Sequence, residues 1–172
     1  MEMLKSAIRD IPDFPKEGII FKDITPLLAN GNTFKKTIDT LKDRYAGKQI
    51  DTVVGIEARG FIFASALAYA LGAGTVLVRK PGKLPYKTYK QAYSLEYGND
   101  AVEIHQDAFE PGQRIVLIDD VLATGGTIAA TANLIQSNFQ VEIVEAAFLI
   151  ELDFLKGREK IKDLPIYSMM HY

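Results

Sequence analysis

The chain has 172 residues, of which 48% are apolar and 24% are charged, a balance that is ordinary for one soluble globular domain. The formal net charge is −2. The chain as a whole therefore has no attraction for nucleic acid or anionic lipid, and we expect neither as a partner. There is no cysteine and there are only two histidines, which excludes disulfides, cysteine-bound zinc, iron–sulfur clusters, thiol nucleophiles and histidine-rich metal sites.

The N-terminal segment predicts a small hood. A helix is expected over Glu2–Arg9, where apolar residues recur at helical spacing, and an ordered loop over residues 11–18, which are rich in turn formers. Charges within the first ten positions argue against a secretory signal, so a cytoplasmic location is expected. A longer helix begins near Thr33, with Asn32 as its N-cap. We interpret residues 1–32 as the hood of a single domain that spans residues 1–172.

The middle of the chain alternates between short apolar runs and helical segments. This pattern is typical of an α/β fold with a mostly parallel sheet and helices on both faces. The uncharged stretch from residue 60 to 78 is split by Gly72-Ala73-Gly74, so each part is too short to span a membrane. The expected strands are Asp51–Ile56, Thr75–Arg79, Ile115–Asp119 and Val141–Ile150, and the expected helices are Gly60–Leu71 and Gly125–Ser137.

Residues 92–106 have a different pattern, because apolar side chains alternate on both sides of Gly98-Asn99-Asp100. This predicts a hairpin that turns at those three residues, and we expect residues 84–106 to form a flexible antiparallel flap. Glu96 alternates with its two apolar neighbours, which is compatible with an inward carboxylate, although an exposed strand glutamate fits the pattern as well. His105 is interpreted as a hairpin or surface residue.

The segment that carries chemistry is 116–127, Val-Leu-Ile-Asp-Asp-Val-Leu-Ala-Thr-Gly-Gly-Thr. An apolar strand ends in two carboxylates, and a loop rich in glycine and threonine leads into a helix. Free amides at a helix start favour an anion, and Gly125-Gly126 lets the backbone approach it, so the loop predicts a phosphate cradle. Asp119 and Asp120 would repel a phosphate, but they suit the vicinal hydroxyls of a sugar or Mg²⁺. The predicted ligand is a phosphorylated sugar.

Cations are concentrated in residues 79–90, where five occur and no acid does. Such a run is usually a solvated loop, but beside a phosphate site some of its members would neutralise substrate charge. We expect Arg79, Lys80 and Lys83 to do so, rather than Lys87 and Lys90. Arg59 follows another predicted strand, at the ligand edge of the sheet, and its forked guanidinium suits a phosphate. The alternative is a surface arginine at a helix start.

On these residues the sequence resembles the type I phosphoribosyltransferases, whose fingerprint is the strand, acid pair and Thr-Gly-Gly-Thr loop of residues 116–127. Four further segments narrow the resemblance to the adenine-using branch of that family, namely 14–25, 55–61, 79–85 and 94–98. They occur in the order and at the spacing found in that branch, and the resemblance covers essentially the whole chain. The resemblance implies the type I fold and a homodimer. It also implies the Mg²⁺-dependent reaction of adenine with 5-phosphoribosyl-1-pyrophosphate (PRPP) to give AMP and pyrophosphate.

The resemblance also implies roles for individual residues. It makes Glu96 the general acid/base near the purine, and it places Mg²⁺ mainly on the substrate, with Asp119 and Asp120 as candidate ligands. It further predicts a cis peptide at Glu57–Ala58. Lys22 departs from the family's usual arginine, and lysine cannot reproduce a bidentate contact. The implied groups are Ala123, Thr124, Gly125, Gly126 and Thr127 for the 5-phosphate; Asp119 and Asp120 for the ribose; Glu57, Ala58, Arg59, Gly60, Arg79, Lys80 and Lys83 for the pyrophosphate; and Ile20, Phe21, Lys22 and Val121 for adenine.

Two alternatives stay open at this point. One is a phosphoribosyltransferase for xanthine or hypoxanthine, because base choice depends on a few hydrogen bonds that the sequence does not fix. The other is a non-catalytic regulator that uses the pocket to sense PRPP. Such regulators usually add a DNA-binding segment, for which we find no candidate among the 172 residues.

Overall fold

The computed structural model describes residues 1–95, 98–161 and 163–172. The chain divides into two compact units, Met1–Arg44 and Tyr45–Tyr172, and each is described by itself. The expected organisation as one domain with a hood and a flap stays a prediction. Among the described residues no helix is both long and apolar enough to cross a membrane.

The first unit contains a hairpin that the sequence analysis missed. Strands β1 (Arg9–Pro12) and β2 (Ile20–Asp23) pair antiparallel, with Arg9 opposite Asp23 and Pro12 opposite Ile20. The expected helix over Glu2–Arg9 was therefore too long, and only Glu2–Lys5 (α1) is helical. Strands of four residues are stabilised by their partner and carry little local signal. Two helices follow, α2 (Thr25–Ala29) and α3 (Gly31–Tyr45), the last residue of which belongs to the second unit.

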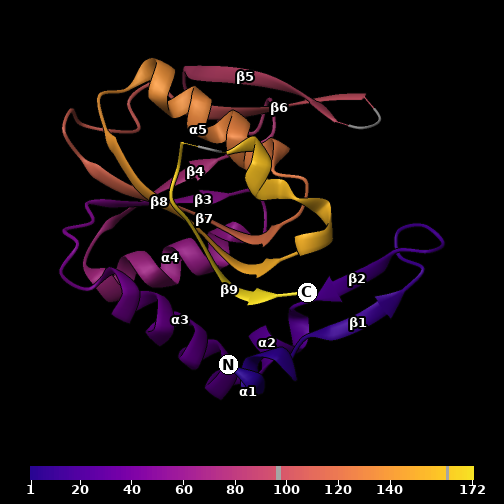
Figure 1. Ribbon diagram of the computed structural model, residues 1–172. Helices are drawn as coiled ribbons and strands as arrows, with labels where there is room; N and C mark the ends of the chain where they lie inside the picture. The colour runs from indigo at the N-terminus through magenta and orange to yellow at the C-terminus, as the bar shows by residue number, and fades with distance from the viewer. Residues whose placement is uncertain (96–97, 162) are drawn as a thin grey trace. The chain divides into compact units, whose positions relative to one another are not determined.

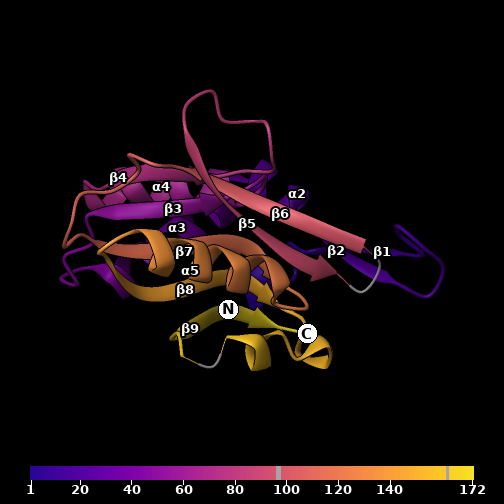
Figure 2. The same cartoon turned by 90° about the horizontal axis from the view of Figure 1, so that it is seen from above.

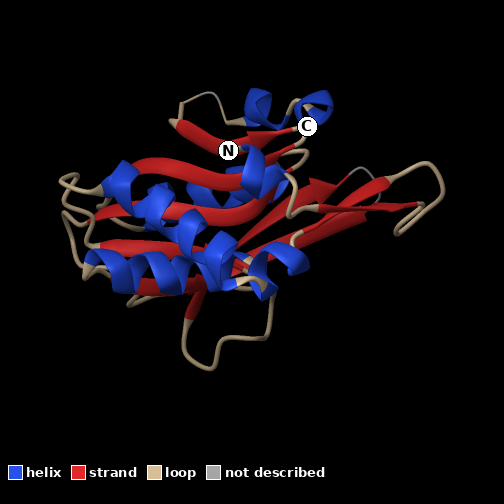
Figure 3. Cartoon of the chain, turned by 90° about the horizontal axis from the view of Figure 1, so that it is seen from below, coloured by secondary structure: helices blue, strands red, loops and turns tan. Residues whose placement is uncertain are grey.

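The second unit is built on a five-stranded parallel sheet in the order β4-β3-β7-β8-β9 (Figures 1 and 2). The α/β architecture predicted from the alternation of strands and helices is confirmed, and Figure 3 colours the two types of element separately. Strand β9 was not predicted. The elements of the second unit are β3 (Thr52–Ile56), α4 (Gly60–Leu71), β4 (Gly74–Val78), β5 (Thr88–Leu95), β6 (Gly98–His105), β7 (Arg114–Leu122), α5 (Gly126–Asn138), β8 (Glu142–Glu151), the 3-10 turns η1 (Asp153–Leu155) and η2 (Gly157–Lys160), and β9 (Ile166–His171).

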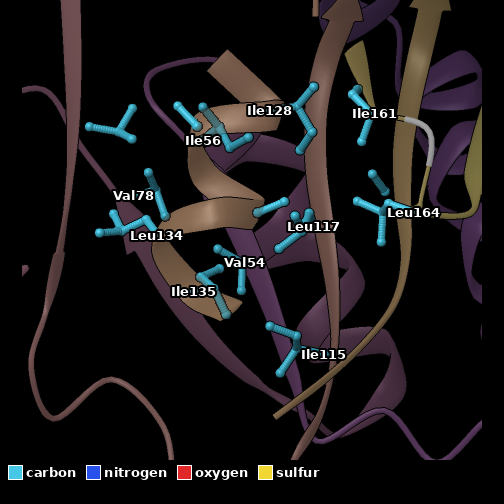
Figure 4. Packing of buried hydrophobic residues seen from close by; sticks show 14 of the residues in the cluster. Val54, Ile56, Val78, Ile115, Leu117, Ile128, Leu134, Ile135, Ile161 and Leu164 are labelled. Atoms are coloured by element: carbon cyan, nitrogen blue, oxygen red, sulfur yellow. The ribbon is translucent and has the colours of Figure 1, made fainter. Parts of the chain in front are cut away.

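Strand alternation assigns the sheet's side chains to two faces. On one face Val54 and Leu117 pack with Leu134 and Ile135 of α5 (Figure 4). On the other face α4 lies so close to β3 that a Cβ added to Gly55 would be 2.9 Å from the Cβ of Ala64. Because both faces are covered, the strands read as continuous apolar runs, which is why their positions were predictable.

The β5–β6 hairpin lies beside this core rather than in the sheet. Leu95 pairs with Gly98, so the strands are joined by residues 96–97, which lie outside the described residues. The predicted turn at 98–100 was therefore wrong, because those residues already belong to β6. Val102 and Ile104 are buried in the same cluster as α5. The base of the predicted flap is thus packed against the core, and its flexibility stays a prediction.

Candidate active site

The predicted phosphate cradle is present where β7 leads into α5. A cavity of about 80 Å³ is lined by residues 121–128 together with Asp119 and Phe148. Helix α5 begins at Gly126, so the backbone N–H groups of its first turn have no partner within the helix and can donate hydrogen bonds to an anion. The structure thus brings together all five residues expected at the 5-phosphate, with Asp119 and Val121 in the same cavity.

The glycines of the cradle have a second role, because they make room for another backbone segment. Gly125 has φ 77°, and a Cβ added there would lie 2.3 Å from the carbonyl oxygen of Gly157 in η2. A Cβ added to Gly157 would lie 2.3 Å from the carbonyl oxygen of Ala123. The sequence analysis missed Gly157, because the contact joins segments far apart in the chain.

A neighbouring ion pair fixes η2 in place. The guanidinium of Arg158, the residue after Gly157, donates to both carboxylate oxygens of the buried Glu151, at 2.6 and 2.7 Å. Burial raises the pKa of Glu151, but the hydrogen bonds from Arg158 and Ser168 outweigh it, so this pKa lies below its ordinary value. This bidentate ion pair therefore ties η2, which contacts the cradle, to the end of β8.

The two adjacent carboxylates have different partners. Strand β7 does not end at Asp119, where the predicted strand ended, but continues to Leu122. Oδ1 of Asp119 accepts the backbone N–H of Asp120 at 2.9 Å. Asp119 lines the cavity. Asp120 is buried and lies 2.6 Å from Nε of Arg59, at the start of α4. Only one of the two acids therefore shares the cavity of the cradle.

Burial makes both carboxylates hard to ionise. It raises the pKa of Asp119 well above its ordinary value, and the charge of the neighbouring Asp120 adds to this rise. Burial also raises the pKa of Asp120, although the positive charge of Arg59 opposes it. A cation or a hydrogen-bond donor at this site would relieve that cost.

The segment after β3 is held by the start of the basic stretch. The Glu57–Ala58 peptide bond is cis, as the resemblance predicts. The carboxylate of Glu57 accepts the backbone N–H of Lys80 at 2.8 Å and lies 3.2 Å from Nε of Arg79. Burial raises the pKa of Glu57, but these hydrogen bonds outweigh it and lower the pKa overall. Glu57 therefore contacts the cationic loop directly.

Three of the four cations expected at the pyrophosphate are already paired with an acid. Arg59 pairs with Asp120, Arg79 with Glu57, and Lys80 with Asp100 of β6. The count of five cations and no acid in residues 79–90 missed these partners, because they come from other elements. Lys83, Lys87 and Lys90 are exposed, and no side-chain ion pair is found for them among the described residues.

The remaining predicted residues are more scattered. Ile20, Phe21 and Lys22 lie on β2 of the first unit, where Lys22 pairs with Asp10 at 2.7 Å. Val121 lies on β7 of the second unit, so an adenine site that joins the two groups stays a prediction. Glu96 lies outside the described residues. His105 ends β6, and its Nε2 accepts the backbone N–H of Tyr86 at 3.4 Å, as expected of a hairpin residue.

Comparison with known proteins identifies the family. The family described as phosphoribosyl transferase domain matches residues 24–168. An adenine phosphoribosyltransferase of Syntrophotalea carbinolica is 58% identical over 172 residues, covering 100% of both chains. The chain belongs to the adenine phosphoribosyltransferase family.

Solved structures of adenine phosphoribosyltransferases have the same fold. That of Thermoanaerobacter pseudethanolicus has a TM-score of 0.95 at 50% identity, covering 99% of each chain. That of Saccharomyces cerevisiae, in complex with an imino-altritol 1,6-bisphosphate and adenine, has a TM-score of 0.92 at 42% identity, covering 98% of this chain and 97% of the other. The resemblance to the type I phosphoribosyltransferases and their fold is thus confirmed.

Proposed function

We propose that this protein transfers the 5-phosphoribosyl group of PRPP to adenine, which gives AMP and pyrophosphate. The observation that carries the proposal is one cavity in which helix-start amides lie next to the carboxylate of Asp119. A phosphate fits the amides and a sugar hydroxyl fits the carboxylate. A phosphorylated ribose satisfies both, whereas a phosphate alone gives the Asp119 carboxylate no donor from the ligand.

The reaction replaces one bond at the anomeric carbon of ribose by another. The bond to pyrophosphate breaks, and the leaving group keeps the electron pair. The bond to N9 of adenine forms, and the N9 proton passes to a base, for which we propose Glu96. Positive charge builds up on the ribose during this exchange, and Asp119 in the cavity is placed to stabilise it.

The leaving group requires positive charge that can move toward it. In our proposal Arg59, Arg79, Lys80 and Lys83 supply this charge, and the backbone of residues 57–60 approaches the pyrophosphate. Because three of these cations are paired with acids, they are already oriented near the site. Binding then exchanges a carboxylate for a phosphate, which keeps each cation paired.

The residues fit Mg²⁺, the cofactor that the family resemblance implies. Asp119 and Asp120 are adjacent carboxylates whose raised pKa values show that their charge is poorly compensated, and carboxylate oxygens are suitable ligands for this ion. When bound, Mg²⁺ would neutralise the pyrophosphate. The chain's own contribution is to hold the ribose hydroxyls at Asp119 and to keep Asp120 fixed by Arg59.

Adenine is the base that the relatives support. They carry adenine phosphoribosyltransferase as their name, and the yeast enzyme was solved with adenine. We propose that Ile20, Phe21, Lys22 and Val121 form the adenine site. Phe21 packs edge-on against Phe14, with ring centroids 5.2 Å apart, which stabilises an aromatic surface on β2 for a flat base.

One assay tests the proposal. The protein is incubated with PRPP and Mg²⁺ and with adenine, hypoxanthine or xanthine in turn, and the nucleotide is detected. We expect AMP from adenine and much slower product from the other bases. Binding of PRPP without product from any base would favour the sensing regulator instead. AMP formation that survives the double substitution Asp119→Ala/Asp120→Ala unchanged would contradict the site.

The oligomeric state and location are also proposals. We propose a homodimer in the cytoplasm, as the resemblance implies. Apolar side chains exposed on α4 and β4 support the dimer, because Ile62, Tyr69 and Leu77 are 41%, 90% and 36% exposed in the single chain. Light scattering on the purified protein would measure the mass, and Tyr69→Glu is expected to shift it toward the monomer.

A further inference from the structure

The β5–β6 hairpin carries a hydrogen-bond network that reaches both phosphate regions. The hydroxyl of Tyr93 lies 3.1 Å from Oγ1 of Thr127 in the cradle and 3.3 Å from Nζ of Lys80 in the basic loop. It also lies 3.2 Å from a carboxylate oxygen of Asp100, which forms an ion pair with the same Lys80. One tyrosine on the hairpin thus connects the cradle to the basic loop.

Packing gives Tyr93 a fixed position in this network. A Cβ added to Gly126 would lie 3.5 Å from Cδ2 of the tyrosine ring, which is ordinary van der Waals contact. Nζ of Lys80 lies 5.7 Å from the centroid of the same ring, a cation–π distance. The ring therefore lies against the first residue of α5, and its hydroxyl points between Lys80 and Thr127.

Proton counting shows which groups the network occupies. Lys80 can only donate hydrogen bonds, the ionised Asp100 can only accept them, and Tyr93 has one proton to give. The hydroxyl of Tyr93 forms a stronger hydrogen bond when it donates to the charged carboxylate of Asp100 than when it donates to the neutral hydroxyl of Thr127. Tyr93 then accepts from Lys80 and from the hydroxyl of Thr127. The protons of Lys80 and Thr127 that would bind phosphate are therefore directed at the hairpin.

The Lys80–Asp100 pair is ionised over the neutral pH range. The hydrogen bond from Lys80 holds the pKa of Asp100 below its ordinary value. Burial lowers the pKa of Lys80, but hydrogen bonds to Asp100 and Tyr93 outweigh it and raise this pKa. The side chains of Lys80 and Asp100 are 40% and 27% exposed, so a ligand can reach both.

We propose that Asp100 and Tyr93 are positioning residues that compete with the substrate, with Asp100 occupying Lys80 in place of pyrophosphate and Tyr93 occupying Thr127 in place of the 5-phosphate. Substrate binding then releases the hairpin from both groups at once. The inference rests on the proposed function in one respect, that the ligand carries phosphate at both ends. It predicts that weakening the network tightens binding, whereas a merely structural role predicts weaker binding.

Isothermal titration calorimetry tests the proposal with two probes, each of which binds one of the two phosphate regions. The probes are inorganic pyrophosphate for the basic loop and ribose 5-phosphate for the cradle. We expect Asp100→Asn to tighten pyrophosphate about two- to fivefold, the range for a partly exposed ion pair. We expect Tyr93→Phe to tighten ribose 5-phosphate, because Thr127 regains its proton. The matched control is Glu103→Gln, which removes the same charge from β6, although its carboxylate accepts the Gly82 N–H at 3.1 Å rather than pairing with Lys80. It should leave both affinities unchanged.

The outcomes separate this inference from the proposed function. Weaker or unchanged pyrophosphate binding in Asp100→Asn, in a protein that makes AMP, would overturn the competition alone. Equal tightening in Glu103→Gln would also overturn it, because general electrostatics would then be the cause. A wild-type protein that binds neither probe and makes no AMP would overturn both proposals. A KM for PRPP that falls in Asp100→Asn at unchanged kcat is the matching kinetic result, and thermal melts confirm that each variant is folded.

Discussion

The cradle of residues 121–128 and the basic loop of residues 79–90 are two different ways to hold a phosphate. The cradle contains no charged side chain and relies on backbone amides fixed by close contact between Gly125 and Gly157. The basic loop carries five cations, but Arg79 and Lys80 are already paired with Glu57 and Asp100. The amides of the first region are therefore ready to bind, whereas Arg79 and Lys80 of the second have to exchange partners.

This difference teaches that local charge alone does not identify a binding group. A backbone site has no internal competitor, because its amides face an open cavity. A side-chain site in a folded protein finds acids from neighbouring elements, and these set how much of its charge a ligand can use. If the comparison is right, the cradle should be sensitive to shape and the loop to charge.

The largest expected effect comes from adding one methyl group to the cradle. Gly125 and Gly82 have φ values of 77° and 76°, but an added Cβ meets backbone at 2.3 Å only at Gly125, with nothing within 4 Å at Gly82. Both alanine variants carry the strain of positive φ, about 1–2 kcal/mol. We expect Gly125→Ala also to displace the cradle and to reduce AMP formation about 100-fold, whereas Gly82→Ala stays active.

The measurements are thermal melts and steady-state kinetics on both variants. Equal losses of activity would mean that backbone strain, rather than the clash with Gly157, controls the site, and the comparison between the two regions would fail.

The next effect separates function from stability at Asp119. We expect Asp119→Asn to lower kcat/KM about 10- to 100-fold, the value of a hydrogen bond to a charged group. The same change removes a buried charge next to Asp120, so we expect the melting temperature to rise by about 2–4 °C, corresponding to about 1 kcal/mol. Asp120→Asn should change it less, because the charge of Arg59 opposes the same burial cost. A destabilised Asp119→Asn would contradict the assigned burial cost.

The pH dependence of stability gives an independent check on the same pair. The pKa values of Asp119 and Asp120 are raised by folding, so the folded protein binds protons more tightly than the unfolded chain. Their contribution is complete below about pH 4 and is lost as the pH rises through the raised values. Acids with lowered pKa values, such as Asp23 at about 2, contribute in the opposite sense and lose stability only below their ordinary range. We expect Asp119→Asn to flatten the decline of melting temperature above pH 4.5, and an unchanged slope would contradict the raised pKa.

The smallest effects should come from the exposed lysines of the basic loop. Lys83 acts on Glu57 through its charge, whereas Lys87 is exposed near the start of β5. We expect Lys83→Ala to raise the KM for PRPP about two- to fivefold and Lys87→Ala less than twofold. Both effects should diminish at high salt. If both substitutions change the KM equally at low and high salt, the loop acts through shape as the cradle does.

The elements that determine the fold of the second unit were predictable from local sequence. Strands β3 and β7 read as apolar runs because both of their faces are buried. Helix α4 begins at Gly60 and is followed by Gly72, and helix α5 begins after Gly125. By contrast, β1 and β2 were missed because strands of four residues are specified by their partners. Strand β9 was also missed. The hairpin was predicted, but its turn was wrongly placed at residues 98–100, because Gly-Asn-Asp resembles a turn although it is paired within β6.

The sequence by itself determined the parallel α/β fold, the cradle, the acid pair and the family, because each depends on residues that are adjacent in the chain. Only the tertiary structure decided that Asp119 and Asp120 have different partners, that Gly157 fits beneath Gly125, and that Arg59, Arg79 and Lys80 are already paired. The physical reason is the same in each case. These properties depend on atoms that folding brings together from distant segments of the chain. Counting charges or glycines along the sequence cannot identify such partners.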